Sequence, residues 1–148
     1  MITIAKAEPN EYEEIDEVVR QTWLSTYVDD LVTQEDVLTF LNGKGVYDGI
    51  YIAKDENKIV GMIKIIEKDD HIYLKQLYIL PEYQGQGIGL RLLNTIETDK
   101  KIYLQVSSSN TGAIRFYIKH GFVKMAKEDF FVINGKHIPV FIYCKQNK

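Results

Sequence analysis

Apolar residues along the chain either alternate with polar ones or recur at helical spacing, and each pattern predicts an element. Alternation predicts strands over residues 2–7, 50–54, 58–67, 71–80, 102–106, 122–133 and 137–145. Helical spacing predicts helices over residues 11–25, from 33 to near Asn42-Gly43, over about 87–99 and from 110 to 120. Strands interleaved with helices indicate an α/β fold whose mixed sheet is covered on both faces.

Short sequence signals predict how several of these elements begin, end and connect. Thr33 precedes Glu35 and Asp36, which is typical of an N-cap and an acidic first turn. Asn134-Gly135 lies between two alternating segments and predicts a tight hairpin. Short polar turns separate the three strands between residues 50 and 80, so we expect an antiparallel meander there.

Composition narrows the class of protein. A chain of 148 residues with 45% hydrophobic and 26% charged residues predicts one domain over residues 1–148. The net charge of −3 argues against a nucleic-acid partner, which needs a clustered basic face. No apolar run approaches the roughly 20 residues that cross a membrane, and no secretory signal pattern opens the chain. Cys144 is the only cysteine, so we expect a reducing, cytoplasmic location without a disulfide.

The glycine-rich segment from Gln84 to Gly89 carries the strongest chemical signal. It joins an apolar strand to an amphipathic helix, and its glycines let backbone N–H groups approach an anion near the helix start. This predicts a phosphate-bearing ligand, with a tight turn that binds nothing as the alternative. A nucleotide loop needs Gly-Lys-Ser/Thr, but Leu90-Arg91 follows Gly89. A dinucleotide turn needs a different glycine spacing and a later acidic residue.

A second motif follows about twenty residues further on. It begins at Asn110 and reads Asn-Thr-Gly-Ala-Ile-Arg-Phe-Tyr-Ile-Lys-His-Gly-Phe. Together, Gln84-x-x-Gly87-x-Gly89 and this segment resemble the coenzyme A signature and the Asn-x-x-Ala-x-x-x-Tyr helix of the GCN5-related N-acetyltransferase (GNAT) family. The resemblance covers roughly residues 50–125, whereas the N-terminal quarter and the last hairpin match only in their element pattern.

The resemblance implies a bifurcated, mostly antiparallel sheet of about seven strands flanked by four helices. Acetyl-CoA would lie in the V between the strand that ends at Leu80 and the one that ends at Val106. Strand backbone would pair with the pantetheine arm, and turn N–H groups would hold the pyrophosphate. The implied cofactor-binding residues are Leu77, Tyr78, Ile79, Gln84, Gly85, Gln86, Gly87, Ile88, Gly89, Leu90, Asn110 and Ala113.

The resemblance also implies a reaction. Tyr117 would act as the general acid that protonates the CoA thiolate as it leaves, and the alternative is a packed aromatic beside Phe116. Many relatives supply a glutamate base on the strand before the serine run, but Gln105 stands there. Another carboxylate acting through water, such as Glu67, or deprotonation by solvent would then serve. A strand N–H group, that of Ile79, would hold the oxyanion.

Other residues are weaker candidates. The family places its first two helices over the acceptor mouth, so Trp23, Tyr27 and Tyr47 either line the acceptor pocket or pack in the core. Six of the residues 8–17 are acidic, which predicts a solvated helix face or a surface that attracts a cationic amine. No metal site is expected, because the spacing of the three histidines does not suit a metal.

We therefore expect an enzyme that moves an acetyl group from acetyl-CoA to a primary amine by direct attack. The amine would belong to a small molecule or to a protein or peptide N-terminus or lysine. The alternative outside the enzymes is a regulatory module that senses acyl-CoA without turnover. A monomer and a homodimer paired through the closing strand both stay open.

Overall fold

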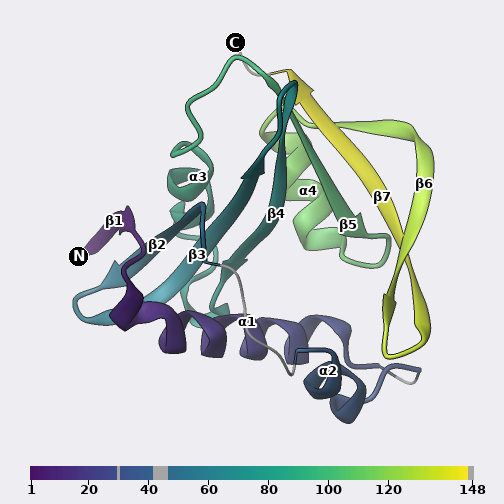
Figure 1. The fold of residues 1–148 in the computed structure, drawn as a ribbon, viewed down its shortest axis with the longest axis horizontal. Helices are drawn as coiled ribbons and strands as arrows, with labels where there is room; N and C mark the ends of the chain where they lie inside the picture. The colour runs from purple at the N-terminus through teal and green to yellow at the C-terminus, as the bar shows by residue number, and fades with distance from the viewer. Residues whose placement is uncertain (30, 42–46, 147–148) are drawn as a thin grey trace.

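A seven-stranded sheet runs through the molecule, and its strands fan out from one end (Figure 1). The computed structural model describes residues 1–29, 31–41 and 47–146. The strands are β1 (Ile2–Lys6), β2 (Ile50–Asp55), β3 (Lys58–Glu67), β4 (His71–Ile79), β5 (Lys101–Ser107), β6 (Val123–Ile133) and β7 (Lys136–Gln146). Their order is β1-β2-β3-β4-β5-β7-β6, and only β4 and β5 are parallel neighbours. The predicted mixed, mostly antiparallel α/β fold is confirmed.

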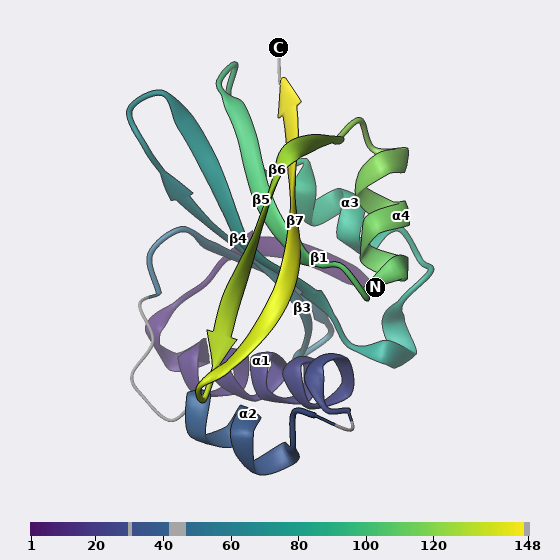
Figure 2. The same cartoon turned by 90° about the vertical axis from the view of Figure 1, so that its right-hand side faces the viewer.

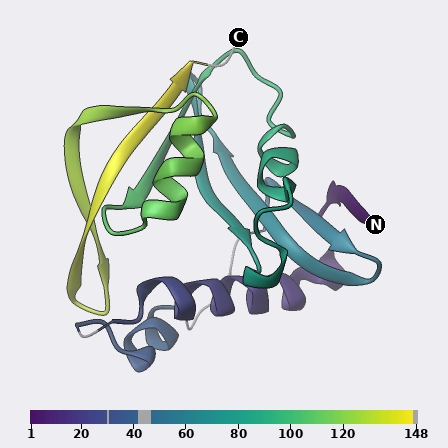
Figure 3. The ribbon, with the colours of Figure 1, turned by 180° about the vertical axis from the view of Figure 1, so that it is seen from behind.

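Helices cover the two faces of this sheet. Among the described residues they are α1 (Tyr12–Tyr27), α2 (Gln34–Phe40), α3 (Ile88–Leu93) and α4 (Thr111–Lys119), with short 3₁₀ turns at Pro9–Glu11 and Pro81–Tyr83. Successive residues of β3 pack on opposite faces of the sheet. Met62 belongs to a cluster with Ile15 of α1, and Ile63 belongs to another cluster with Leu92 of α3. Helices α3 and α4 lie together on the face seen from behind in Figure 3.

Local sequence signals explain where the helices begin and end. The side chain of Thr33 accepts a hydrogen bond from the N–H group of Asp36, which confirms the predicted N-cap of α2. The Asp36 carboxylate accepts the N–H group of Thr33 in return, so the two residues form a capping box. The expected end of α2 near Asn42-Gly43 lies outside the described residues. Gly121 follows α4 with φ of 94°, as the C′ position of a helix favours.

The third helix corrects the sequence-based expectation. The pattern predicts a helix over about 87–99, whereas α3 ends at Leu93. Thr95 donates both its N–H group and its hydroxyl to the carbonyl of Leu92, at 3.0 and 2.7 Å, and these tight bonds end the helix. Ile96 lies beyond the helix but is still buried, at 8% exposure. An apolar residue at helical spacing therefore made the predicted helix too long.

The closing hairpin of β6 and β7 reaches across to the first two helices. Asn134 and Gly135 have φ values of 48° and 81°, as a two-residue turn with left-handed positions requires. Figure 2 shows the tip of this hairpin beside α2. Ile133, just before the turn, is fully buried in a cluster with Trp23 of α1 and Val37 of α2. The hairpin therefore packs on α1 and α2 as well as on the sheet.

Candidate functional site

Strands β4 and β5 form a V because they pair over only a short stretch. Their parallel ladder joins His71–Tyr73 to Lys101–Tyr103, and beyond those residues the strands diverge (Figure 1). Lys64 and Ile65 of β3 lie opposite Gln76 and Leu74, so Lys75 is the extra residue of a β-bulge in β4, near the start of the divergence. The predicted bifurcated sheet is thus present.

The β4 edge of the V offers free backbone groups. Leu80 donates its N–H group to the carbonyl of Val60, and the antiparallel register pairs Tyr78 with Met62 in the same hydrogen-bonding phase. Because the phase alternates along an antiparallel strand, Leu77 and Ile79 direct their backbone groups toward β5 instead. An extended ligand lying in the V therefore meets backbone groups of two predicted cofactor-binding residues, of which the Ile79 carbonyl also accepts a hydrogen bond from the Gln84 side chain.

The β5 edge of the V follows the same alternation. Ser108 donates its N–H group to the carbonyl of Pro139 of β7, which places the backbone groups of Gln105 and Ser107 on the side facing β4. The Gln105 side chain is exposed. Gln105 occupies the position at which many relatives have a glutamate base, and its side-chain amide cannot accept a proton from the amine.

The glycine turn closes the open end of β4. Gly85 and Gly87 have φ of 79° and 81°, in the left-handed region that glycine favours, and Gly87 is the N-cap of α3. A Cβ atom on either residue would meet no atom within 4 Å, so these backbone groups border open space. The Gln84 side chain donates to the Ile79 carbonyl at 3.0 Å and ties the turn to the strand. Left-handed glycines beside open space are the backbone arrangement that lets a phosphate group approach N–H groups closely.

Gly89 has a different role from the other two glycines of the motif. A Cβ atom there would lie 3.2 Å from ring carbons of Phe116 on α4. Its lack of a side chain therefore lets α3 pack closely against α4. Ile88 is buried in the same layer, at 2% exposure. The predicted binding residues in α3 thus include two that also serve helix packing.

Helix α4 presents the second motif toward this layer. The side chain of Asn110 accepts a hydrogen bond from the N–H group of Ala113 at 3.2 Å, so it caps the helix. Tyr117 follows on the same helix face, with its ring 7% exposed and in edge contact with Phe116 and Phe122, both at 5.4 Å between ring centroids. The Tyr117 ring is therefore held in place by its aromatic neighbours.

Four tyrosines of three elements converge near the V. Burial raises the pKa of each hydroxyl above its ordinary value: Tyr27 of α1, Tyr73 and Tyr78 of β4, and Tyr117 of α4. The pKa of Tyr27 rises to about 12, with its electrostatic interaction with the Tyr73 hydroxyl as the second cause. The interaction with the Tyr27 hydroxyl likewise raises the pKa values of Tyr78 and Tyr117, although burial is the largest cause for both. All four hydroxyls are neutral proton donors near pH 7.

The hydroxyl of Tyr78 is fixed, and the other three are available. The indole N–H of Trp23 donates to the Tyr78 oxygen at 2.8 Å. Across residues 1–29, 31–41 and 47–146, the hydroxyls of Tyr27, Tyr73 and Tyr117 form no hydrogen bond. Every fully buried side-chain oxygen or nitrogen of the same residues has a hydrogen-bond partner. The three unbonded hydroxyl oxygens are therefore not fully buried. A bound substrate can therefore bond to them.

An aromatic wall, formed by Trp23, Tyr27 and Phe131, joins α1 to the closing hairpin. The rings of Trp23 and Tyr27 lie 4.6 Å apart, and that of Phe131 lies 6.1 Å from Trp23 and 5.5 Å from Tyr27. Trp23 is buried, so it supports the wall from the core side, whereas Tyr27 and Phe131 are half-buried. Phe131 has no motif around it, and strand alternation alone gave no reason to single it out.

Tyr47, the third aromatic of the predicted pocket, lies elsewhere. Its ring stacks on Tyr12 at 4.0 Å, and its hydroxyl donates to Asp16 at 2.6 Å. Both partners belong to the first half of α1, whereas Trp23 and Tyr27 belong to the second. Tyr47 therefore packs apart from the aromatic wall.

The carboxylates proposed from the sequence have structural partners. Glu67 forms an ion pair with Lys100 at 2.9 Å and lies opposite Ile72, where β4 and β5 are still paired. In the acidic run, Glu14 accepts the N–H group of Ile59 at 2.8 Å, and Glu11 pairs with Lys54 at 2.9 Å. These acids hold elements together, which favours the structural interpretation of the run.

Two features are absent from the described residues: a cluster of metal ligands and a membrane-spanning helix. No group of three or more histidine, cysteine, aspartate or glutamate side chains in the described part of the chain is arranged to hold a metal ion. None of the helices in that part is both long and apolar enough to span a bilayer.

Comparison with known proteins points to one family. Residues 47–124 match the family model described as an acetyltransferase (GNAT) domain. A spermidine N(1)-acetyltransferase of Vibrio cholerae is 33% identical over 130 residues, covering 76% of this chain and 74% of that protein. A spermine/spermidine N(1)-acetyltransferase of Bacillus subtilis is 31% identical over 80 residues, covering 49% of this chain and 51% of the relative, so the match spans about half of that protein.

Solved structures share the fold over nearly the whole chain. The PaiA N-acetyltransferase of Thermoplasma acidophilum, in complex with coenzyme A, superposes with a TM-score of 0.80 at 22% identity and covers 99% of both chains. The ribosomal-protein-S18-alanine N-acetyltransferase of Escherichia coli gives a TM-score of 0.72 at 19% identity, covering 100% of this chain and 96% of that one. At these identities the likeness concerns the fold.

Proposed function

Since the chain belongs to the GNAT family of acetyltransferases, we propose that it acetylates the primary amine of a small molecule. It is an acetyl-CoA-dependent N-acetyltransferase, as its family is. The observation that carries the proposal is the V itself: an open strand edge, a glycine turn at its end and the available Tyr117 hydroxyl beside it.

The backbone around the V fits coenzyme A. Leu77 and Ile79 would pair with the amide groups of the pantetheine arm as an added strand does. The N–H groups from Gly85 to Leu90 would bind the pyrophosphate, and the open space beside Gly85 and Gly87 leaves room for it. When bound, acetyl-CoA supplies the acetyl group as an activated thioester.

Tyr117 would serve as the general acid. Its hydroxyl would donate a proton to the departing sulfur as the acceptor nitrogen bonds to the acetyl carbon and the carbon–sulfur bond breaks. The proton that the new amide nitrogen then loses would return through solvent to the Tyr117 oxygen. The raised pKa of Tyr117 keeps that proton in place before the step. The N–H group of Ile79, directed into the V, would stabilise the oxyanion.

Gln105 has no proton-accepting role in this scheme. Because this amide replaces a carboxylate, we infer that the acceptor amine loses its proton to solvent before it attacks. The rate with an amine would then follow the fraction of that amine that is neutral, so kcat/KM would rise with pH up to the pKa of the acceptor itself.

A small amine suits the acceptor side. The rings of Tyr27 and Phe131 would contact the methylene groups of such an amine, and a ring face would attract its cationic nitrogen. Two relatives are named for spermidine and spermine, which supports an acceptor of this size and charge. We propose a polyamine-like acceptor rather than a protein N-terminus.

Two measurements test the proposal. Calorimetry with coenzyme A and acetyl-CoA should give heat at millimolar ligand, and thiol release from acetyl-CoA should depend on added spermidine. A matched series of monoamines and short peptides with free N-termini gives the acceptor class. Binding without thiol release with any amine would support the sensor instead, and faster release with the peptides would overturn the small-amine acceptor.

A further inference from the structure

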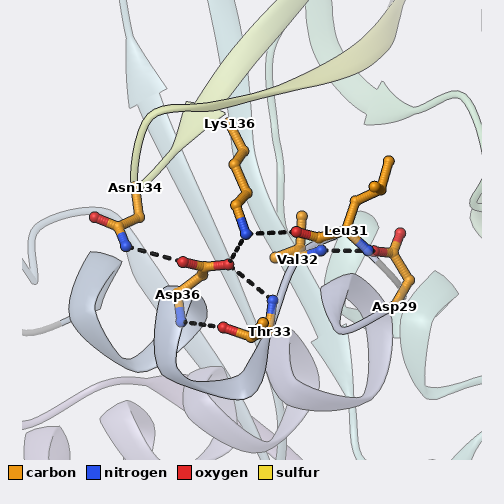
Figure 4. A network of polar contacts seen from close by, with 7 residues as sticks. All are labelled: Asp29, Leu31, Val32, Thr33, Asp36, Asn134 and Lys136. Carbon is orange, nitrogen blue, oxygen red and sulfur yellow. Dashed lines mark hydrogen bonds and ion pairs between the residues drawn. The ribbon is translucent and has the colours of Figure 1, made fainter.

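A buried carboxylate of α2 joins the tip of the closing hairpin (Figure 4). Asp36 accepts a hydrogen bond from the side-chain amide of Asn134 at 2.9 Å and forms an ion pair with Lys136 at 2.5 Å. Lys136 also donates to the carbonyl of Leu31, in the segment before α2. We call Asp36, Asn134 and Lys136 the latch.

Asp36, the centre of the latch, is a buried carboxylate whose two oxygens both accept hydrogen bonds. Asp36 is 8% exposed, and its second oxygen also accepts the N–H group of Thr33 at 2.8 Å within the capping box of α2. The Lys136 ammonium, together with the Thr33 N–H group and Asn134, holds the pKa of Asp36 well below its ordinary value. The charged carboxylate is therefore the form that binds the hairpin.

The hairpin needs such an anchor because the sheet does not hold its tip. The pairing of β7 with β5 ends at Ser107 opposite Val140. One further bond joins the Ser108 N–H group to the carbonyl of Pro139. Beyond it, residues 136–138 of β7 pair only with residues 131–133 of β6, as a two-stranded ribbon. Two-stranded ribbons are marginally stable by themselves, so contacts with α1 and α2 set where this one lies.

The latch lies next to the aromatic wall along the same ribbon. Phe131 pairs with Ile138, three residues before Asn134, and the buried Ile133 lies between them. On the helix side, Val37 follows Asp36 directly and is fully buried in the cluster that contains Trp23. A shift of the hairpin tip would therefore carry Phe131 away from Tyr27.

We propose that Asp36 is a positioning residue for the acceptor amine. By holding Asn134 and Lys136, it keeps Phe131 against Trp23 and Tyr27, and so it fixes the aromatic wall that the acceptor contacts. This inference rests on the proposed function, because it assigns the acceptor to that wall. Asp36 touches neither the acceptor nor the acetyl group.

Graded changes in the two hairpin partners test the role. Asn134→Gly removes one bond and suits the left-handed turn, while Lys136→Met removes the charge partner. Both should raise the KM for spermidine, with Lys136→Met reaching about tenfold, while kcat and the heat of coenzyme A binding stay unchanged. Lys136→Arg should restore most of the wild-type KM. Glu128→Gln, which removes a hairpin ion pair with Lys124, is the matched control.

A double variant separates positioning from general destabilisation. Once Phe131→Ala has removed the wall, adding Lys136→Met should raise the KM no further. A KM that multiplies in the double variant, or single variants with an unchanged KM, would overturn the inference.

Trp23 gives a readout that does not depend on turnover. It is the only tryptophan of the chain, so its emission should shift to longer wavelength in Lys136→Met and stay unchanged in Glu128→Gln. Unchanged emission in Lys136→Met would overturn the positioning role. Absence of turnover by the wild-type chain, with the emission shift intact, would refute the proposed function instead.

Discussion

The two sides of the V are built by different means. On the cofactor side, the groups offered to a ligand are backbone groups of Leu77, Ile79 and the glycine turn, all within one continuous segment. On the acceptor side, the groups are side chains of α1, β4 and the closing hairpin, brought together from distant parts of the chain. In the proposed function, the first side binds the cofactor, which all reactions of the family share, and the second side binds the acceptor, which differs between them.

This difference explains how the two sides depend on sequence. A backbone site needs particular dihedral angles and little bulk, so it leaves a glycine motif. An aromatic wall needs only ring contacts, and aromatic residues at many different positions in the sequence can make them. Motifs therefore find the cofactor side, and three-dimensional contacts are needed to find the acceptor side.

We expect the largest effect from Tyr117→Phe, which should change the rate of the reaction without changing cofactor binding. Loss of the proton donor should lower kcat at least about tenfold, or about 1.4 kcal/mol in the barrier, with coenzyme A affinity unchanged. Thiol release under saturating substrates measures it. Tyr12→Phe removes a hydroxyl from the far end of α1 and should leave kcat unchanged. A normal kcat in Tyr117→Phe would remove this residue from the mechanism.

A change in the glycine turn should affect the cofactor side alone. Gly87→Ala forces an L residue into the left-handed region at a cost of roughly 1–2 kcal/mol. The free turn relieves this strain by leaving the conformation that binds the pyrophosphate, so coenzyme A binding should weaken about tenfold by calorimetry. Gly135→Ala introduces the same strain, since both glycines have φ of 81° and open space around the Cβ position. It should lower stability without weakening coenzyme A binding. Equal losses of affinity in both variants would contradict a binding role for the turn.

The acceptor side should respond in the opposite way. Phe131→Ala removes ring contacts with Trp23 and Tyr27 worth about 0.5–1.5 kcal/mol, so the KM for spermidine should rise about two- to tenfold. Coenzyme A affinity should not change. Phe130→Ala deletes a neighbouring ring that is 51% exposed and lies on the opposite face of β6, and it should leave the KM as it is. A similar rise in both variants would mean that the hairpin, rather than the wall, matters.

The smallest effect concerns the latch and pH. A depressed carboxyl pKa contributes stability that is complete above the unfolded-state pKa of about 4 and is lost as the pH falls through the folded-state pKa. We therefore expect the Tm of the wild type to exceed that of Asp36→Asn at pH 7. The gap should narrow below about pH 4. Thermal melts between pH 7 and 3 measure this, and a gap that does not change with pH would exclude a charged latch.

The sequence predicted much of the fold because its strands alternate clearly and its caps use strong signals such as Thr33 and Gly121. It overextended α3, since Ile96 is buried at helical spacing although the chain has already left the helix. The family pattern named Trp23 and Tyr27 as candidates for the acceptor pocket, and the structure places their rings in contact. The sequence could not find Phe131 or the latch, because these depend on where a hairpin over ninety residues away from α2 comes to rest.

The short ladder between β4 and β5 has a mechanical consequence. Three residue pairs are all that hold strands β1 to β4 and strands β5 to β7 in one sheet, so the two halves resemble the leaves of a hinge. A ligand that bonds to both inner edges would act as a missing eighth strand and brace the leaves. Coenzyme A should then slow amide hydrogen exchange at Leu77 and Ile79 and raise the melting temperature of the whole chain.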